Sequence, residues 1–255
     1  MTTEAQSRPS LTKVYWLEQS GADVPPDDDW LGPREVACLN ALHIPKRRAD
    51  WRLGRWTAKR AVSICLNTPG NFKGLAGIEI RPAATGAPDV FLDNQAAAVT
   101  ISLSHSNGTA LCAVAPPGTD LGCDLEAIEP RSDAFVADYF TSDEQTLIAG
   151  ALAADRFRLL ALLWSAKESA LKALHEGLRL DTRSVTVRLP ENVPASTPDE
   201  MPTAHTFTEC YSIWRPLEVH CAGGHVFQGW WGQTGNLLQT LVAAPAPARP
   251  ILLQV

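Results

Sequence analysis

Two stretches decide how this chain folds: Leu121-Gly122-Cys123-Asp124-Leu125-Glu126 and Trp164-Ser165-Ala166-Lys167-Glu168-Ser169-Ala170-Leu171-Lys172. The first alternates in character and predicts a strand, so Asp124 and Glu126 face the same side. The second predicts a helix in which Trp164, Glu168 and Lys172 share one stripe. Packed together, strand and helix would bring three carboxylates and a lysine into one place. Carboxylate oxygens suit Mg²⁺, and an ammonium group suits a phosphate oxygen.

The composition describes a globular protein with a substantial core. The chain has 255 residues, 45% of them hydrophobic, which is enough for one large domain or two small ones. It has no apolar run long enough to span a membrane, and its first eight residues lack the apolar centre of a signal peptide. We therefore expect a cytoplasmic protein with no membrane partner. The net charge of −6 disfavours nucleic acid as a partner.

A basic segment stands out against this acidic background. Residues 46–60 carry seven lysines and arginines against one acidic residue, Asp50. On a helix, Arg48, Arg52, Arg55 and Lys59 form one row with no acidic partner in that row. The row is either a solvated helix face or an anion site, and we favour the anion site because a bound phosphate would relieve the repulsion between like charges.

Periodicity and turn residues predict alternating strands and helices. Ser106-Asn107-Gly108 is a hairpin signal, Ser142-Asp143-Glu144-Gln145 fits a capping box, and Gly177 is expected to end the helix before it. Residues 190–202 are expected to form a surface loop. Strands are predicted at 11–18, 76–81, 88–92, 97–104, 111–115, 121–126, 183–189, 207–215, 225–231 and 237–244, and helices at 34–43, 46–66, 132–139, 142–153 and 155–175. This order indicates an α+β protein.

The motifs resemble those of the Sfp-type 4′-phosphopantetheinyl transferases, in the same order along the chain. Ser102-Leu103-Ser104-His105-Ser106 resembles the family's Ser-His-Ser strand end, and Gly122-Cys123-Asp124-Leu125-Glu126 its Gly-x-Asp-x-Glu motif. Tyr139-Phe140-Thr141-Ser142-Asp143-Glu144 resembles a Phe-Phe-Ser-x-x-Glu segment, and residues 164–172 a Trp-x-x-Lys-Glu-x-x-x-Lys helix. The resemblance covers about residues 45–190, and the combined order makes it specific.

The resemblance implies transfer of the phosphopantetheine arm of coenzyme A to a serine of an apo acyl or peptidyl carrier protein, with adenosine 3′,5′-bisphosphate as co-product. It implies a pseudo-dimer of two similar α+β halves, residues 1–115 and 116–255, with the site in the cleft between them and no need for a second chain. Mg²⁺ is expected on Asp124, Glu126 and Glu168, and Mn²⁺ would satisfy the same ligands. Contacts to coenzyme A are expected from residues of both halves: Arg48, Arg52, Arg55, Ser104, His105, Lys167 and Lys172.

Two points of chemistry stay open in the sequence. Asp124, Glu168 and Lys172 are the expected catalytic residues, and the base that deprotonates the serine is either Glu168 or a metal-bound water. Gly86-Ala87-Pro88 stands where the family often has Gly-Lys-Pro, so a coenzyme A contact is lost there or comes from the basic helix.

Two other functions compete with the transferase. A Mg²⁺-dependent nuclease or phosphohydrolase uses similar carboxylate and lysine sets, although Lys167 precedes Glu168 here and net acidity disfavours nucleic acid. A non-catalytic coenzyme A or carrier-protein binder is disfavoured because all three carboxylates are intact.

Overall fold

The computed structural model describes residues 11–190 and 214–254. Its helices are α1 (Pro33–Asn40), α2 (Pro45–Cys65), α3 (Phe72–Ala76), α4 (Asp133–Tyr139), α5 (Ser142–Gly150) and α6 (Arg156–Ala173). Its strands are β1 (Tyr15–Ser20), β2 (Ile78–Pro82), β3 (Pro88–Leu92), β4 (Gln95–Ala96), β5 (Thr100–Ser106), β6 (Thr109–Ala115), β7 (Asp120–Ala127), β8 (Val185–Arg188), β9 (Arg215–Cys221), β10 (Val226–Thr234), β11 (Leu237–Ala244) and β12 (Ile251–Leu252). The predicted α+β class is confirmed.

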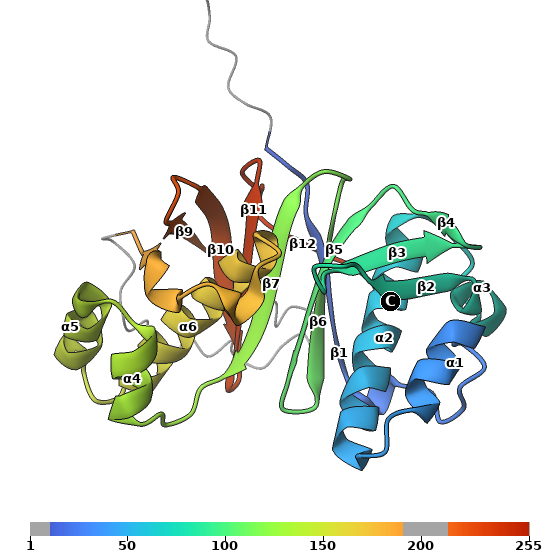
Figure 1. The fold of residues 1–255 in the computed structure, drawn as a ribbon, viewed down its shortest axis with the longest axis horizontal. Helices are drawn as coiled ribbons and strands as arrows, with labels where there is room; N and C mark the ends of the chain where they lie inside the picture. Colours follow the sequence, from blue (N-terminus) through green and yellow to red (C-terminus); the bar gives the residue numbers. More distant parts are fainter. Residues whose placement is uncertain (1–10, 191–213, 255) are drawn as a thin grey trace, which may run out of the picture.

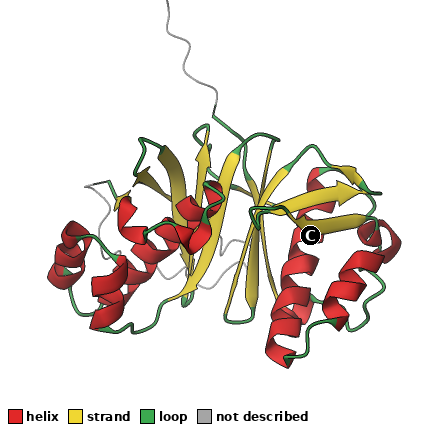
Figure 2. Ribbon diagram, viewed as in Figure 1, coloured by secondary structure: helices red, strands yellow, loops and turns green. Residues whose placement is uncertain are grey.

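The strands form two principal sheets that meet in the middle of the molecule, with the helices on the outer sides (Figure 1, Figure 2). The first sheet has the order β12-β1-β6-β5 and the second β7-β11-β10-β9-β8, while β2-β3-β4 form a smaller third sheet. Helix α2 lies on the first half and α6 on the second (Figure 1). One hydrophobic cluster lies under each helix, and a third, which includes Trp16, Leu111, Leu125 and Leu241, joins the two sheets.

The two halves repeat one arrangement. The strand order β1-β6-β5 corresponds to β7-β11-β10, the hairpin β2–β3 corresponds to β8–β9, and one long helix follows the first strand of each half. The sequence repeats with it, because Trp56-Thr57-Ala58-Lys59 on α2 is matched by Trp164-Ser165-Ala166-Lys167 on α6. The two halves therefore share one order of strands and one long helix each, the kind of repetition that a pseudo-dimer would have.

A buried ion pair braces the first half. Lys59 on α2 and Glu35 on α1 form an ion pair, and their side chains are 0% and 4% exposed. The Lys59 ammonium also donates hydrogen bonds to the carbonyl oxygens of Trp30 and Leu75, at 2.9 and 3.1 Å. Glu35 in turn accepts the backbone N–H of Ile80 on β2 at 3.1 Å. The pair thus ties two helices to the hairpin β2–β3.

The second half contains the same brace. Lys167 on α6 lies 2.8 Å from Glu144 on α5, and these side chains are 0% and 3% exposed. The Lys167 ammonium donates to the carbonyl oxygens of Thr182 and Val185, and Glu144 accepts the backbone N–H of Val187 on β8 at 3.2 Å. Since buried charges persist only when they are paired and hydrogen-bonded, each pair is a structural joint of its half.

Most predicted elements lie where the sequence placed them. The hairpin at residues 106–108 is confirmed, because Asn107 and Gly108 both have positive φ, 53° and 76°, as a tight two-residue turn requires. The capping box is displaced by one residue, since Thr141 is the N-cap and Glu144 the reciprocal partner. Gly177 does not end α6, which stops at Ala173 and turns through His175 at φ 57°.

Differences concentrate near the end of the chain. Strand β9 begins at Arg215, where the predicted strand 207–215 should end, and residues 207–213 and most of the predicted loop 190–202 lie outside the described residues. The sequence also missed β12, which pairs in parallel with β1 and so returns to the first half. Within the described ranges, none of the helices combines the length and the apolar character needed to cross a bilayer.

Candidate active site

The site forms around β7, whose outer edge lies against β5 of the other half. Two serine side chains on β5 reach across to it. Ser102 Oγ accepts the backbone N–H of Cys123 at 2.9 Å, and Ser104 Oγ donates to Asp124 Oδ1 at 2.8 Å. The predicted Ser104 contact is thus, in this structure, a hydrogen bond to Asp124, and it fixes the carboxylate at the junction between the halves.

Gly122 sets the approach of helix α6 to β7. A Cβ atom built on Gly122 would lie 1.7 Å from the carbonyl oxygen of Ser169 and 3.0 Å from the backbone nitrogen of Ala173. Only glycine fits such a contact between two backbones. The close packing brings Glu168, next to Ser169 on α6, and Lys172, one turn further along, to the edge of β7 where Asp124 lies.

Hydroxyl groups hold α6 against the sheet from the other side. Ser165 Oγ and Ser169 Oγ lie 2.8 and 2.7 Å from Thr240 Oγ1 on β11, and all three residues are fully buried. Thr240 is the register partner of Asp124. Small polar residues in the helix motif therefore serve the packing that positions its charged residues.

An acidic chamber of about 390 Å³ opens between these elements. Its charged and polar lining residues are Ser104, His105, Asp124, Glu126, Glu168 and Lys172. The three predicted carboxylates thus line one cavity, from β7 and α6, with Trp164 and Leu103 as apolar walls. His105 is an exposed residue at this wall.

Asp124 is the most enclosed of the carboxylates. Its Oδ1 accepts hydrogen bonds from Lys172 Nζ at 2.7 Å and from Ser104 Oγ, and Lys172 also donates to the Cys123 carbonyl oxygen at 3.0 Å. Its Oδ2 is buried without a hydrogen-bond partner among the described residues. A buried, unsatisfied carboxylate oxygen is costly, and a cation in the chamber would satisfy it.

Burial and neighbouring negative charge raise the pKa of each of the other two carboxylates, Glu126 and Glu168. Burial and the charge of Asp124 raise the pKa of Glu126 to about 7, against the opposing effect of Arg131. Burial and Asp124 also raise the pKa of Glu168, whereas Lys172 lowers it. Burial, the largest single effect, would lower the pKa of Lys172, but the charge and hydrogen bond of Asp124 together with the charges of Cys123 and Glu168 outweigh it, so the pKa is raised. The chamber lining therefore carries more negative than positive charge, with three carboxylates against Lys172.

The side chains do not form a closed metal site as they stand. Within residues 11–190 and 214–254, no three His, Cys, Asp or Glu side chains gather closely enough to hold a metal ion. Glu126 instead forms an ion pair with Arg131. The donor set still fits a hard divalent cation, because three carboxylates line one cavity and Asp124 Oδ2 is free to coordinate.

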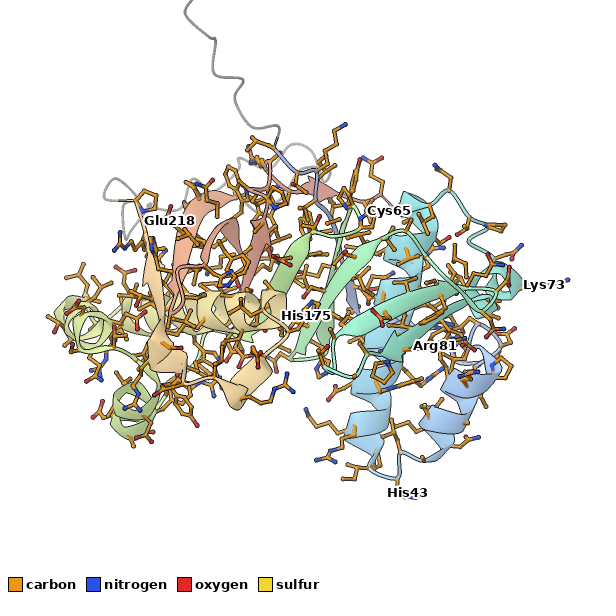
Figure 3. The ribbon with its side chains drawn as sticks, turned by 45° about the horizontal axis from the view of Figure 1, so that its top comes forward. His43, Cys65, Lys73, Arg81, His175 and Glu218 are labelled. Carbon is orange, nitrogen blue, oxygen red and sulfur yellow. The ribbon has the colours of Figure 1, made fainter. Side chains whose placement is uncertain are left out.

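A second, basic chamber of about 530 Å³ adjoins the first, and Lys172 and Leu103 line both. Besides Lys172, its arginines come from three places, Arg55 from α2, Arg81 from β2 and Arg179 from the segment after α6, and that segment also contributes His175 and Glu176. Figure 3 shows Arg81 and His175 on the facing sides of the two halves. The turn Gly86-Ala87-Pro88 forms part of the wall.

Three of the four residues in the predicted basic row on α2 are engaged by other groups of the protein. Arg52 pairs with Asp28 at 2.8 Å and donates to carbonyl oxygens of residues 25–27, and Arg48 donates to the Leu39 carbonyl oxygen at 2.7 Å. Lys59 is buried against Glu35. The acidic partners Asp28 and Glu35 lie in α1 and in the loop before it, so the residue pattern of α2 alone does not reveal them. Arg55 is the member of the row that lines the basic chamber.

The structure corrects the placement of Lys167. A fully buried ammonium engaged by Glu144 and two carbonyl oxygens has no access to a ligand, so Lys167 is part of the brace and not a coenzyme A contact. Sequence reasoning also missed Arg81 and His175, which lie in no recognisable motif. Arg179 lies in Gly177-Leu178-Arg179-Leu180, which resembles the family's Gly-Leu segment after the long helix, but the sequence assigned it no contact.

Known proteins resemble this chain in one region. A family model described as the 4′-phosphopantetheinyl transferase superfamily matches residues 120–214. The model is that of the superfamily and does not distinguish the Sfp type. No curated protein sequence matches the chain.

Several solved structures show weaker likeness. One is a holo-(acyl-carrier-protein) synthase from Bacillus anthracis in complex with CoA (3′,5′-ADP), 20% identical over 42% of this chain and 97% of that chain, with a TM-score of 0.36. The Helicobacter pylori synthase in complex with coenzyme A is 18% identical over 40% and 96%, with a TM-score of 0.32. The Thermotoga maritima synthase is 17% identical over 52% and 76%, with a TM-score of 0.31.

The matched region contains Asp124, Glu126, Glu168 and Lys172, the charged residues of the acidic chamber contributed by β7 and α6. The resemblance read from the motifs is therefore confirmed at the level of the superfamily. Residues 120–214 of this chain therefore match the family model of the 4′-phosphopantetheinyl transferase superfamily and contain the charged residues of the acidic chamber.

Proposed function

We propose that this protein transfers the 4′-phosphopantetheine arm of coenzyme A to a serine of an apo acyl or peptidyl carrier protein, as a monomer, and releases adenosine 3′,5′-bisphosphate. The observation that carries the proposal is the position of Lys172, whose side chain lines both chambers and contacts Asp124. A pyrophosphate at this junction would extend its nucleotide into the basic chamber and its bridging oxygens toward the acidic one.

The transfer breaks one bond and forms another. The serine Oγ attacks the phosphorus that carries the pantetheine, an O–P bond forms, and the P–O bond to the bridging oxygen breaks. Adenosine 3′,5′-bisphosphate leaves with that oxygen. Lys172, which lines both chambers, would stabilise the negative charge that develops on the phosphate oxygens. Glu168 would accept the serine proton, a role supported by its place in the chamber lining and by the absence of a hydrogen bond or ion pair to it among the described residues.

The three carboxylates, Asp124, Glu126 and Glu168, would hold the divalent cation, Mg²⁺ or Mn²⁺. When bound, the cation would neutralise charge on the pyrophosphate. Within the chain itself, Ser104 keeps Asp124 oriented toward Lys172, and the brace of Lys167 and Glu144 holds the helix that carries Glu168.

Intact-protein mass spectrometry tests the proposal directly. An apo carrier protein incubated with this protein, coenzyme A and Mg²⁺ should gain the mass of one phosphopantetheine arm. Asp124→Asn should abolish the gain, and Asp143→Asn, an exposed residue of α5, should not. No gain with acyl and peptidyl carriers, despite coenzyme A binding, would favour a binder. Cleavage of plasmid DNA that Asp124→Asn removes would favour the nuclease.

The basic chamber leads to a separate prediction about coenzyme A binding. Arg81 pairs with Glu79 and Arg179 with Glu176, whereas Arg55 shares Glu35 with the closer Lys59. Arg55 therefore has the least compensated charge of the three guanidinium groups. We expect Arg55→Ala to raise the KM for coenzyme A by about tenfold or more, the equivalent of one charge-assisted hydrogen bond, with a smaller change in kcat.

Arg48→Ala is the matched control, since Arg48 lies on the same helix but binds the Leu39 carbonyl oxygen and is not part of the chamber lining. Steady-state kinetics with varied coenzyme A would measure both variants. Equal KM values for the two variants would contradict the assignment of Arg55.

A further inference from the structure

Arg131 lies in the segment between β7 and α4 and contacts a carboxylate of the acidic chamber. Its guanidinium forms an ion pair with Glu126 and a second one with Glu129, at 3.1 Å. It also lies 5.4 Å from the centre of the Phe135 ring on α4. The proposed transfer leaves these contacts without a role.

The contact engages one of the three carboxylates that line the cavity. Asp124 keeps a free Oδ2, and Glu168 makes no hydrogen bond or ion pair among the described residues, but Glu126 is held by a cation. The Glu126 side chain is 16% exposed and that of Arg131 is 32% exposed, so water screens their attraction only in part. A metal ion that required Glu126 would have to displace the guanidinium.

Arg131 has an alternative partner already in contact. If Glu126 released Arg131 to bind a cation, Glu129 would still pair with Arg131, and the Phe135 ring would still lie against the guanidinium. Separation of Arg131 from Glu126 would therefore not leave the guanidinium charge unpaired. Phe135 also packs against Trp164 of the chamber wall, with ring centres 5.0 Å apart. The aromatic ring beside Arg131 is therefore in contact with the wall of the acidic chamber.

We propose that Arg131 competes with the divalent cation for Glu126, holding this carboxylate when the chamber is empty of metal and passing to Glu129 when the cation binds. The inference rests on the proposed metal site of the transferase. It makes Arg131 a positioning residue that lowers the affinity of the site for metal.

Binding of Mn²⁺ to the full-length protein, followed by electron paramagnetic resonance of the free ion, measures this competition without the reaction. We expect Arg131→Ala to tighten Mn²⁺ binding by about tenfold, as the loss of one charge-assisted hydrogen bond to a competitor implies. Arg156→Ala is the matched control, because Arg156 on α6 pairs with Asp133 at the start of α4 and not with Glu126. The Arg156→Ala protein should bind Mn²⁺ with the same affinity as the unchanged protein.

A second variant separates partner exchange from simple charge removal. Glu129→Gln removes the alternative partner and should weaken Mn²⁺ binding, but this effect should vanish in the Arg131→Ala background. A Glu129→Gln effect of the same size in both backgrounds would overturn the exchange.

The remaining outcomes are equally decisive. Equal affinity in Arg131→Ala and the unchanged protein would overturn the competition while leaving the transferase intact. Absence of Mn²⁺ binding in the unchanged protein and in all variants would refute both the proposed competition and the proposed metal site. Normal Mn²⁺ binding without any gain in carrier mass would refute the proposed function alone.

Discussion

Replacing Lys167 with alanine should destabilise the fold by about 3–5 kcal/mol, because it leaves Glu144 buried without its partner. Both side chains are almost fully inaccessible to water, and the ammonium also satisfies two carbonyl oxygens. For a protein of this size, the loss corresponds to a fall in Tm of roughly 10 °C or more. Denaturant unfolding followed by circular dichroism measures it.

Two further variants isolate the cause. Lys46→Ala removes an exposed lysine from an ion pair within α2 and should cost less than about 0.5 kcal/mol. In the Lys167→Met background, Glu144→Gln should recover part of the loss, because the neutral amide still accepts the Val187 N–H. A Lys167→Ala protein as stable as the Lys46→Ala protein would refute the brace.

Replacing Gly122 with alanine is the second change with a large expected effect. The new methyl group would overlap the backbone of α6 at Ser169, and neither backbone can yield by rotation of a side chain. We expect a loss of about 3 kcal/mol or more, at the upper end of overpacking effects. The folded fraction should also lose activity, since the displaced helix carries Glu168 and Lys172.

Gly150→Ala provides the control for this substitution. Gly150 is the last residue of α5, a methyl group added to it would meet no atom of the other described residues within 4 Å, and its φ is not in the left-handed region. This change should be neutral or slightly stabilising. Thermal melting would measure the loss of stability, and carrier modification would measure the loss of activity. A Gly122→Ala protein with unchanged Tm would show that α6 can move away from β7 without cost.

The sequence predicted the chamber well because its residues lie on regular elements. Period-two alternation placed Asp124 and Glu126 on one face of β7, and period-four spacing placed Glu168 and Lys172 on one stripe of α6. The elements themselves also agree closely, and β11 matches its predicted bounds at both ends.

The errors have a common physical origin in partners that are distant along the chain. The row of cations on α2 looked unpaired because Asp28 and Glu35 precede the helix, and Lys167 looked available because its partner Glu144 lies on another helix. Helix periodicity describes one element and cannot show which face another element covers. The repeated Trp-x-Ala-Lys segments at 56–59 and 164–167 were the available signal for both braces.

Strand β12 has a consequence for biosynthesis. It extends the first sheet at β1, and Leu253 beside it is buried in the cluster under α2. While the ribosome is still translating the second half, the first half has an unpaired strand edge and a gap in its core. Such an edge invites pairing with other chains. We therefore expect the two halves to complete folding together after residue 253 has emerged, rather than one after the other.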